Sequence, residues 1–124
     1  MSSTLRGVVL CHGEVAGAMI DAVEHISGTG HVLVPLSNRD CDRASLRDRL
    51  LEAIDHHDSV VFVDLPTGSC LMAALRCRHE AANVRVVSGV NIPMLLDFVF
   101  HLDRTVDEAA ASAVVHGVQG IGQP

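Results

Sequence analysis

Short apolar runs alternate along the chain with longer segments whose apolar residues recur every three or four positions. The runs cover residues 7–11, 31–36, 60–63 and 84–87. Such runs are typical of strands that are buried on both faces. Helical periodicity fills the intervals, over residues 15–26, about 45–54 and 69–82, and again from residue 93. The pattern therefore predicts strands and helices in alternation.

Residues that favour helix ends sharpen these boundaries. Glycines are expected to close the first helix, a polar side chain to begin the second and third, proline to occupy the first turn of the fourth, and a capping box to open a fifth that ends near Gly117. The residues concerned are Gly28 and Gly30, then Asp42 or Ser45, then Ser69, Pro93, and Thr105 with Glu108.

Two helices have apolar stripes that indicate which face is buried. In the first, the stripe is Val15, Met19, Ala22, Val23 and Ile26, and in the second it is Leu46, Leu50, Ala53 and Ile54. Phe98 and Phe100 are expected to pack beneath the fourth helix.

Alternating strands and helices imply a parallel sheet with helices on both faces. We therefore predict an α/β fold, a single doubly wound domain over residues 1–124, with a mainly parallel four-stranded sheet in the order 2-1-3-4. The last residues, with Gly120, Gly122 and Pro124, are expected to form either a frayed tail or a short extra strand.

Composition narrows the class of function. The net charge of −6 argues against nucleic acid and against anionic membrane surfaces, and the absence of lysine excludes a Schiff-base mechanism. Four cysteines without a CxxC pair, and no apolar stretch of roughly 18 residues, predict a cytoplasmic protein with reduced thiols and no membrane insertion.

Candidate chemistry lies where the predicted strands end. His12 follows the first strand and Asp64 follows the third, and these strands are neighbours in the order 2-1-3-4. A carboxylate bonded to one ring nitrogen would fix the tautomer and leave the other, Nδ1 or Nε2, free as a nucleophile. Gly68 and Ser69 precede a helix whose N-terminus suits a phosphoryl anion.

Three segments resemble the mannose-type enzyme IIA domains of the bacterial sugar phosphotransferase system. They are residues 9–16 around His12-Gly13, residues 63–69 around Asp64, and residues 86–96, which match this family almost residue for residue. The resemblance implies that His12 accepts a phosphoryl group from the phosphocarrier protein HPr and passes it to a IIB component. A related subgroup serves dihydroxyacetone kinase, but the match over residues 88–96 favours the mannose type.

The resemblance also assigns the other site residues. Asp64 would orient the His12 ring. The phosphoryl group would lie at Thr67, Gly68 and Ser69, flanked by Gly13, Ser88 and Asn91. No cofactor is implied, and because such proteins often dimerise, we expect a homodimer.

Two residues depart from the family's aspartate loop, which usually runs Asp-Leu-x-Gly-Gly-Ser-Pro. Thr67 replaces a glycine and so removes freedom that a left-handed turn residue would need, while Pro66 stiffens the loop. Cys70 replaces the proline. At the first turn of a helix its thiol would have a lowered pKa, and the alternative is a small buried hydrophobe.

Other interpretations stay open. The altered loop also fits a regulatory module in which phosphorylation of His12 is a signal and no transporter is served. A flavodoxin-like nucleotide or flavin site is disfavoured because the chain lacks a glycine-rich phosphate fingerprint and flanking aromatics. No metal site is predicted, because no HxxxH or CxxC spacing occurs among the eight histidines and four cysteines. Arg39 is expected to be a solvated loop residue or, alternatively, a phosphoryl contact.

Overall fold

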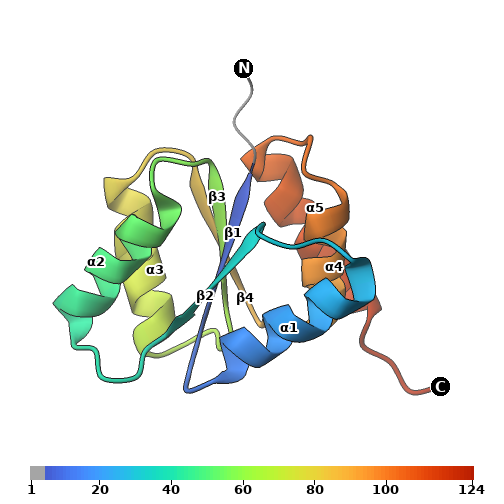
Figure 1. The fold of residues 1–124 in the computed structure, drawn as a ribbon, viewed down its shortest axis with the longest axis horizontal. Helices are drawn as coiled ribbons and strands as arrows, with labels where there is room; N and C mark the ends of the chain where they lie inside the picture. The colour runs from blue at the N-terminus through green and yellow to red at the C-terminus, as the bar shows by residue number, and fades with distance from the viewer. Residues whose placement is uncertain (1–4) are drawn as a thin grey trace.

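The computed structural model describes residues 5–124, so residues 1–4 of the predicted domain lie outside the described part. Strands and helices alternate as the sequence predicts, and a fifth helix follows the fourth directly (Figure 1). The strands are β1 (Arg6–Cys11), β2 (Leu33–Ser37), β3 (Ser59–Val63) and β4 (Val84–Ser88). The helices are α1 (Val15–Ser27), α2 (Arg43–Ile54), α3 (Ser69–Glu80), α4 (Ile92–Phe100) and α5 (Val106–Gln119). Between residues 5 and 124 no helix has the length and apolar character needed to cross a membrane.

All four strands are parallel, and their order is β2-β1-β3-β4, which confirms the predicted doubly wound fold. Leu10 of β1 is in register with Val63 of β3, and Val63 is in register with Ser88 of β4. The carboxyl ends of the three strands therefore lie at one edge of the sheet. The loops that follow them come together there.

Two helical layers cover the sheet: α2 and α3 pack on one face, and α1, α4 and α5 on the other (Figure 1). Alternate strand residues serve the two layers, since Val9 and Phe62 face the second and Val8 and Leu10 face the first. The ring of Phe62 meets Phe98 of α4 edge to face, with centroids 5.4 Å apart. The aliphatic core is thus divided by the sheet into two halves.

The buried face of α1 differs from the prediction. Ala16, Ile20 and Val23 are buried, whereas Val15 and Ile26 of the predicted stripe are 45% and 61% exposed. The apolar residues of α1 cover a wider part of the helix surface than the part that packs on the sheet. The sequence alone therefore did not show which of them are buried. The face of α2 is confirmed, since Leu46, Leu50 and Ile54 are buried.

Phe98 is buried as predicted, but the prediction for Phe100 is wrong because its side chain is 58% exposed. Phe100 is the last residue of α4, and two positions along a helix turn a side chain to the opposite side. The side chain of Phe100 therefore points away from the sheet, against which Phe98 packs.

Most helix ends follow the expected chemistry. The side chain of Asp42 caps α2 by accepting a hydrogen bond from the backbone N–H of Ser45, and Thr105 and Glu108 form the capping box of α5. Gly28 ends α1 in a left-handed conformation. Ser69, however, is not the cap of α3: it is the first helical residue, and Gly68 occupies the capping position.

Helix α5 runs through Gly117 to Gln119, so it ends within two residues of the expected position near Gly117. A Cβ atom on Gly117 would lie 2.5 Å from Cγ and Cε of Met94, which shows that this glycine allows α4 and α5 to pack closely. Of the two alternatives for the last residues, the extra strand is wrong, because residues 121–124 form no strand. The other boundaries fall within two residues of their predicted positions.

Gly7 lies where α4 packs closely on the sheet, and its substitution tests this packing. A Cβ atom there would lie 2.6 Å from Cδ2 of Leu33 and 2.8 Å from the ring of Phe98. We expect Gly7→Ala to lower the free energy of unfolding by about 1–3 kcal/mol through overpacking, measured by urea denaturation. The control is Gly17→Ala in α1, where a Cβ meets open space. It should raise stability by roughly 0.5–1 kcal/mol, and equal effects of the two changes would contradict the packing.

Candidate functional site

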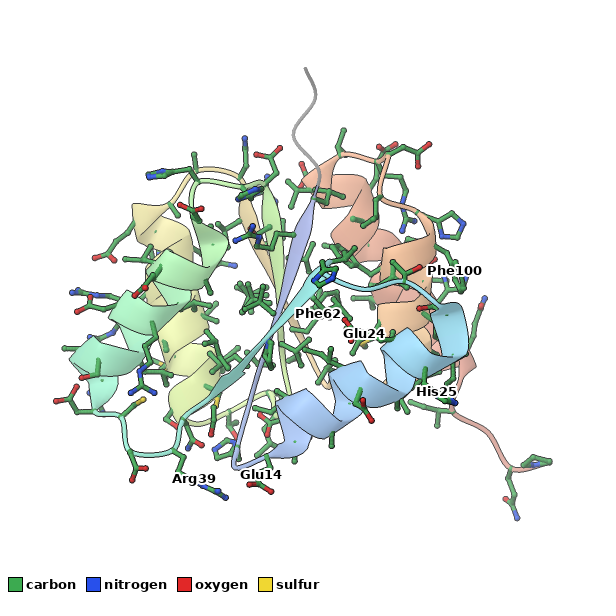
Figure 2. All side chains as sticks on the ribbon, viewed as in Figure 1. Glu14, Glu24, His25, Arg39, Phe62 and Phe100 are labelled. Atoms are coloured by element: carbon green, nitrogen blue, oxygen red, sulfur yellow. The ribbon has the colours of Figure 1, made fainter. Side chains whose placement is uncertain are left out.

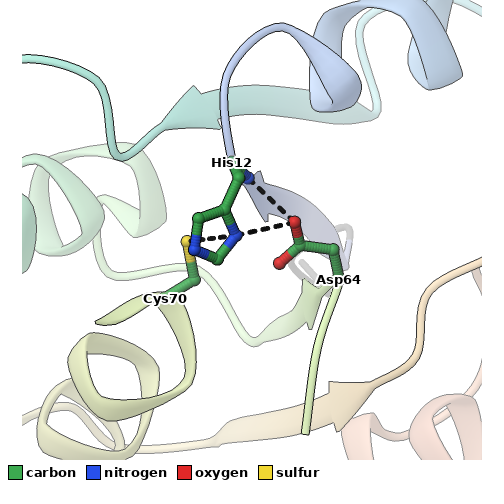
Figure 3. Close-up of side chains that lie close together, drawn as sticks. All are labelled: His12, Asp64 and Cys70. Atoms are coloured by element: carbon green, nitrogen blue, oxygen red, sulfur yellow. Dashed lines mark hydrogen bonds and ion pairs between the residues drawn. The ribbon is translucent and has the colours of Figure 1, made fainter. Parts of the chain in front are cut away.

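His12 and Asp64 are joined by two hydrogen bonds at the carboxyl edge of the sheet (Figure 3). One oxygen of Asp64, Oδ2, accepts from the backbone N–H of His12 at 2.9 Å and lies 2.9 Å from Nδ1 of the His12 ring. The pairing expected from the strand order is therefore present. Because a carboxylate accepts hydrogen bonds, Nδ1 carries the ring proton and the lone pair is left on Nε2.

Neighbouring loops hold His12 in place. Gly13 has a positive φ of 60°, which turns the chain sharply from β1 toward α1, and a Cβ atom there would lie 3.2 Å from Nη2 of Arg39. The backbone N–H of Gly13 donates to the side-chain oxygen of Asn38, and the N–H of Asn38 donates to the carbonyl of Cys11. The end of β2 thus braces the turn that presents His12.

The electrostatics of Asp64 favour its ionised form. Burial acts to raise the pKa of this carboxyl, but the hydrogen bonds from the backbone and ring of His12, with the attraction of the ring charge, outweigh it and hold the pKa below its ordinary value. Its other oxygen, Oδ1, is buried, and within residues 5–124 no donor bonds it. A carboxylate is therefore present beside His12 at neutral pH.

Cys70 is the third side chain of the site. Its Sγ lies 3.8 Å from Nδ1 of His12, and the residue is 1% exposed (Figure 3). Burial, followed by the negative charge of Asp64, raises the pKa of the Cys70 thiol to about 11. The lowered pKa expected of a helix N-terminus is therefore wrong, and the alternative of a small buried residue is confirmed.

The loop between β3 and α3 keeps the glycine that it needs. Gly68 has a φ of 97°, whereas Thr67 is not among the residues of positive φ within the described chain, so a threonine there costs no backbone strain. Thr67, Gly68 and Ser69 are exposed next to Asp64. Among residues 5–124, no side chain caps α3. The N–H groups of its first turn therefore remain available at the site.

The segment after β4 lies beside this loop. Ser88 is exposed and in register with Val63, the residue before Asp64. Asn91 is committed elsewhere: its oxygen accepts from the N–H of Met94, and its amide donates to the carbonyl of Gly117. Asn91 therefore caps α4 and ties it to α5, and among residues 5–124 its side-chain hydrogen bonds go to Met94 and Gly117 and not to His12.

Arg39 lies on the same edge of the molecule, next to Glu14 (Figure 2). Its Nη1 is 3.6 Å from Oε1 of Glu14, and both side chains are largely exposed. Such a pair contributes little to stability. Arg39 is thus a solvated loop residue, as expected, within reach of the His12 turn.

Sequence reasoning missed two features of the site. Asn38 braces the His12 turn, and the available signal was its position directly after β2, the other neighbour of β1. It also did not anticipate that Cys70 contacts His12. Together His12, Asp64 and Cys70 offer three metal-ligand atoms within 4.8 Å of one another. The expectation of no metal site considered only local spacing, which cannot detect ligands from separate segments.

Comparison with known proteins gives one consistent result. A family model described as the fructose IIA component of the phosphotransferase system (PTS), EIIA-man, matches residues 7–118. The sorbose-specific EIIA component of the PTS of Klebsiella pneumoniae is 32% identical over 99 residues, which cover 77% of this chain and 73% of that protein.

Solved structures agree on the fold. The PTS component EIIA from Streptococcus agalactiae superposes with a TM-score of 0.88 at 21% identity, over 96% of both chains. The mannose/sorbose-specific IIA subunit from Enterococcus faecalis gives a TM-score of 0.85 at 20% identity, over 100% of this chain and 96% of that one.

Thiol accessibility tests the environment of Cys70. Cys11, Cys70 and Cys77 are buried, with pKa values raised chiefly by burial to about 12, 11 and 11, and only Cys41 of the four cysteines is partly exposed. At pH 8 a thiol of pKa 11 is about one part in a thousand thiolate. We expect a thiol reagent to label one cysteine quickly in the native protein and four after denaturation. Fast labelling of Cys70, identified by mass spectrometry, would contradict the structure.

Proposed function

The chain belongs to the mannose-type enzyme IIA family of the sugar phosphotransferase system, and on that premise we propose that it is a phosphocarrier whose acceptor is Nε2 of His12. The observation that carries the proposal is the bond between Asp64 Oδ2 and His12 Nδ1. It leaves the lone pair of the ring on the nitrogen that faces away from the carboxylate.

The chemistry is an exchange between two imidazoles. The lone pair of Nε2 attacks phosphorus, the P–N bond to the donor histidine breaks, and the donor imidazole leaves with that electron pair. The His12 ring then bears positive charge, which the ionised Asp64 stabilises through Nδ1–H. No proton has to leave Nδ1 during the transfer, so the same hydrogen bond serves acceptance and release of the phosphoryl group.

The loop after Asp64 supplies the partial charges that the phosphoryl oxygens need. Ser69 begins α3, whose uncapped first turn presents free N–H groups and the positive end of the helix dipole. We assign Thr67, Gly68 and Ser69 to the phosphoryl oxygens, with Gly13 and Ser88 on the flanks. Asn91 acts on the site by holding the start of α4, as its hydrogen bonds indicate.

The partners are proteins that carry phosphohistidine or accept from it: HPr as donor and a IIB component as acceptor, in the cytoplasm. The side chain of His12 is 41% exposed, which allows a partner's reacting group to approach. Leu65 and Met72, which precede and follow residues 67–69 in the chain, are each 50% exposed. They offer apolar contact to such a partner. Transfer to IIB distinguishes this role from the regulatory alternative, in which phosphate stays on His12.

That this chain forms a homodimer remains a prediction, which is based on its family. Its support is a row of exposed apolar side chains on α5 and just beyond, Val114, Val115, Val118 and Ile121. Burial of this row in a second copy predicts that light scattering gives about twice the 13.2 kDa mass of the chain. A single-chain mass at micromolar concentration would contradict it.

Phosphorylation in a reconstituted system tests the proposed function. With phosphoenolpyruvate, enzyme I and HPr, the protein should acquire one acid-labile, base-stable phosphoryl group, which His12→Ala abolishes. The matched control is His25→Ala, because His25 is exposed at the far end of α1 from Glu14 (Figure 2). Asp64→Asn should slow acceptance about ten- to a hundredfold, since a charge-assisted hydrogen bond worth about 1.5–3 kcal/mol is lost. An adduct on His12→Ala, or an unchanged rate in Asp64→Asn, would refute the mechanism.

A further inference from the structure

Beside the His12–Asp64 pair lies a thiol that phosphoryl transfer does not use. Cys70 faces the His12 ring from the first turn of α3, and with His12 and Asp64 it completes a set of nitrogen, oxygen and sulfur donors (Figure 3). We propose that the dephosphorylated protein binds Zn²⁺ through Nδ1 of His12, the carboxylate of Asp64 and Sγ of Cys70. Two of the ligands directly follow β1 and β3 and the third lies in α3, so the fold holds them together.

The spacing fits a zinc ion. Zinc binds nitrogen, oxygen and sulfur at about 2.0–2.3 Å, which places tetrahedral ligand atoms roughly 3.3–3.7 Å apart. In the structure Nδ1 lies 2.9 Å from Oδ2 and 3.8 Å from Sγ, and the whole set falls within 4.8 Å. Rearrangements of about an ångström or less in the side chains bring all three donors to bonding distance.

The surroundings favour an ion at this point. The buried Oδ1 of Asp64 has no hydrogen-bond donor among residues 5–124, and the buried Sγ of Cys70 lies 3.8 Å from Nδ1 of His12. A divalent ion would satisfy both side chains at once. The His12 side chain is 41% exposed, so a water molecule can serve as the fourth ligand. Within the described chain no other three His, Cys, Asp or Glu side chains gather in this way.

Zinc is the ion that this donor set suits. A thiolate disfavours magnesium and calcium, which prefer oxygen ligands, while imidazole, carboxylate and thiolate are all common zinc ligands. On binding, the Cys70 thiol loses its proton to solvent. The His12 ring stays neutral, because the proton displaced from Nδ1 is matched by one taken up on Nε2. One proton is therefore released for each ion bound.

Metal binding has a consequence for the proposed function, on which this step rests. Phosphoryl acceptance needs a lone pair on Nε2 and a proton on Nδ1, and the zinc-bound ring has these two reversed. The zinc-bound protein therefore does not accept phosphate, and phosphorylated and metal-bound states exclude each other. The Cys70 departure from the family's loop would make this protein sensitive to free zinc.

Binding is measured first without any phosphoryl donor, so that its outcome is independent of the proposed function. Titration of the dephosphorylated protein against a chromophoric zinc chelator should give one Zn²⁺ per chain. Cys70→Ala and His12→Ala should each weaken binding at least about tenfold, since loss of a ligand costs no less than loss of an outer-shell partner. Cys41→Ala is the control, because Cys41 is the partly exposed cysteine outside the triad.

Substitution by Co²⁺ supplies a spectroscopic signature. The wild type and Cys41→Ala should show a thiolate-to-cobalt charge-transfer band that Cys70→Ala lacks. His12→Ala is a second variant that removes a ligand. Because the partly exposed side chain of His12 is not part of the core, loss of metal binding in this variant cannot be attributed to misfolding. Absence of stoichiometric binding, or equal affinity of wild type and Cys70→Ala, would overturn the proposal.

The functional part of the experiment compares the rate at which each protein accepts phosphate with the rate of the same protein without metal. Wild type loaded with zinc and freed of excess ion should accept phosphate at least about tenfold more slowly, and a chelator should restore the rate. Cys70→Ala treated in the same way should keep its rate. Equal slowing of both proteins would overturn the exclusion between metal and phosphate.

Discussion

A single carboxylate oxygen, Oδ2 of Asp64, accepts from the backbone of His12 and also bonds its ring, and the arrangement of the site depends on it. These two bonds outweigh the cost of burying the carboxylate, so Asp64 stays ionised. They also fix both the position and the tautomer of the ring. The bonds exist because β1 and β3 are adjacent and parallel: Leu10, two residues before His12, is in register with Val63, which directly precedes Asp64.

Much of this arrangement could be predicted from the sequence. Four apolar runs separated by periodic segments indicated the parallel sheet. The predicted strand order placed His12 and Asp64 at the ends of neighbouring strands. Capping chemistry is equally local, which explains why Asp42 was one of the two caps expected for α2 and why the Thr105–Glu108 box was found correctly. Features determined by a residue and its sequence neighbours are thus visible in the chain itself.

Features that depend on distant packing were not visible. The sequence placed Gly117 near a helix end but did not show that it admits Met94, and it left open whether Cys70 is a reactive thiol or, as the fold shows, a residue buried against His12. The buried face of α1 was also missed, because the apolar residues of this helix cover more of its surface than the sheet does. In each case the deciding neighbour comes from another element, so periodicity and motifs carry no signal of it.

In the proposed mechanism, Asp64 reserves Nδ1 of His12 for a proton and so directs the phosphoryl group to Nε2. Combined ³¹P and ¹⁵N NMR of the phosphorylated, ¹⁵N-histidine-labelled protein tests this most directly, since phosphorus couples to the nitrogen that it is bonded to. We predict a phosphoryl group on Nε2 and a protonated Nδ1 in one histidine, His12. A phosphoryl group on Nδ1, or on any other histidine, would contradict the account.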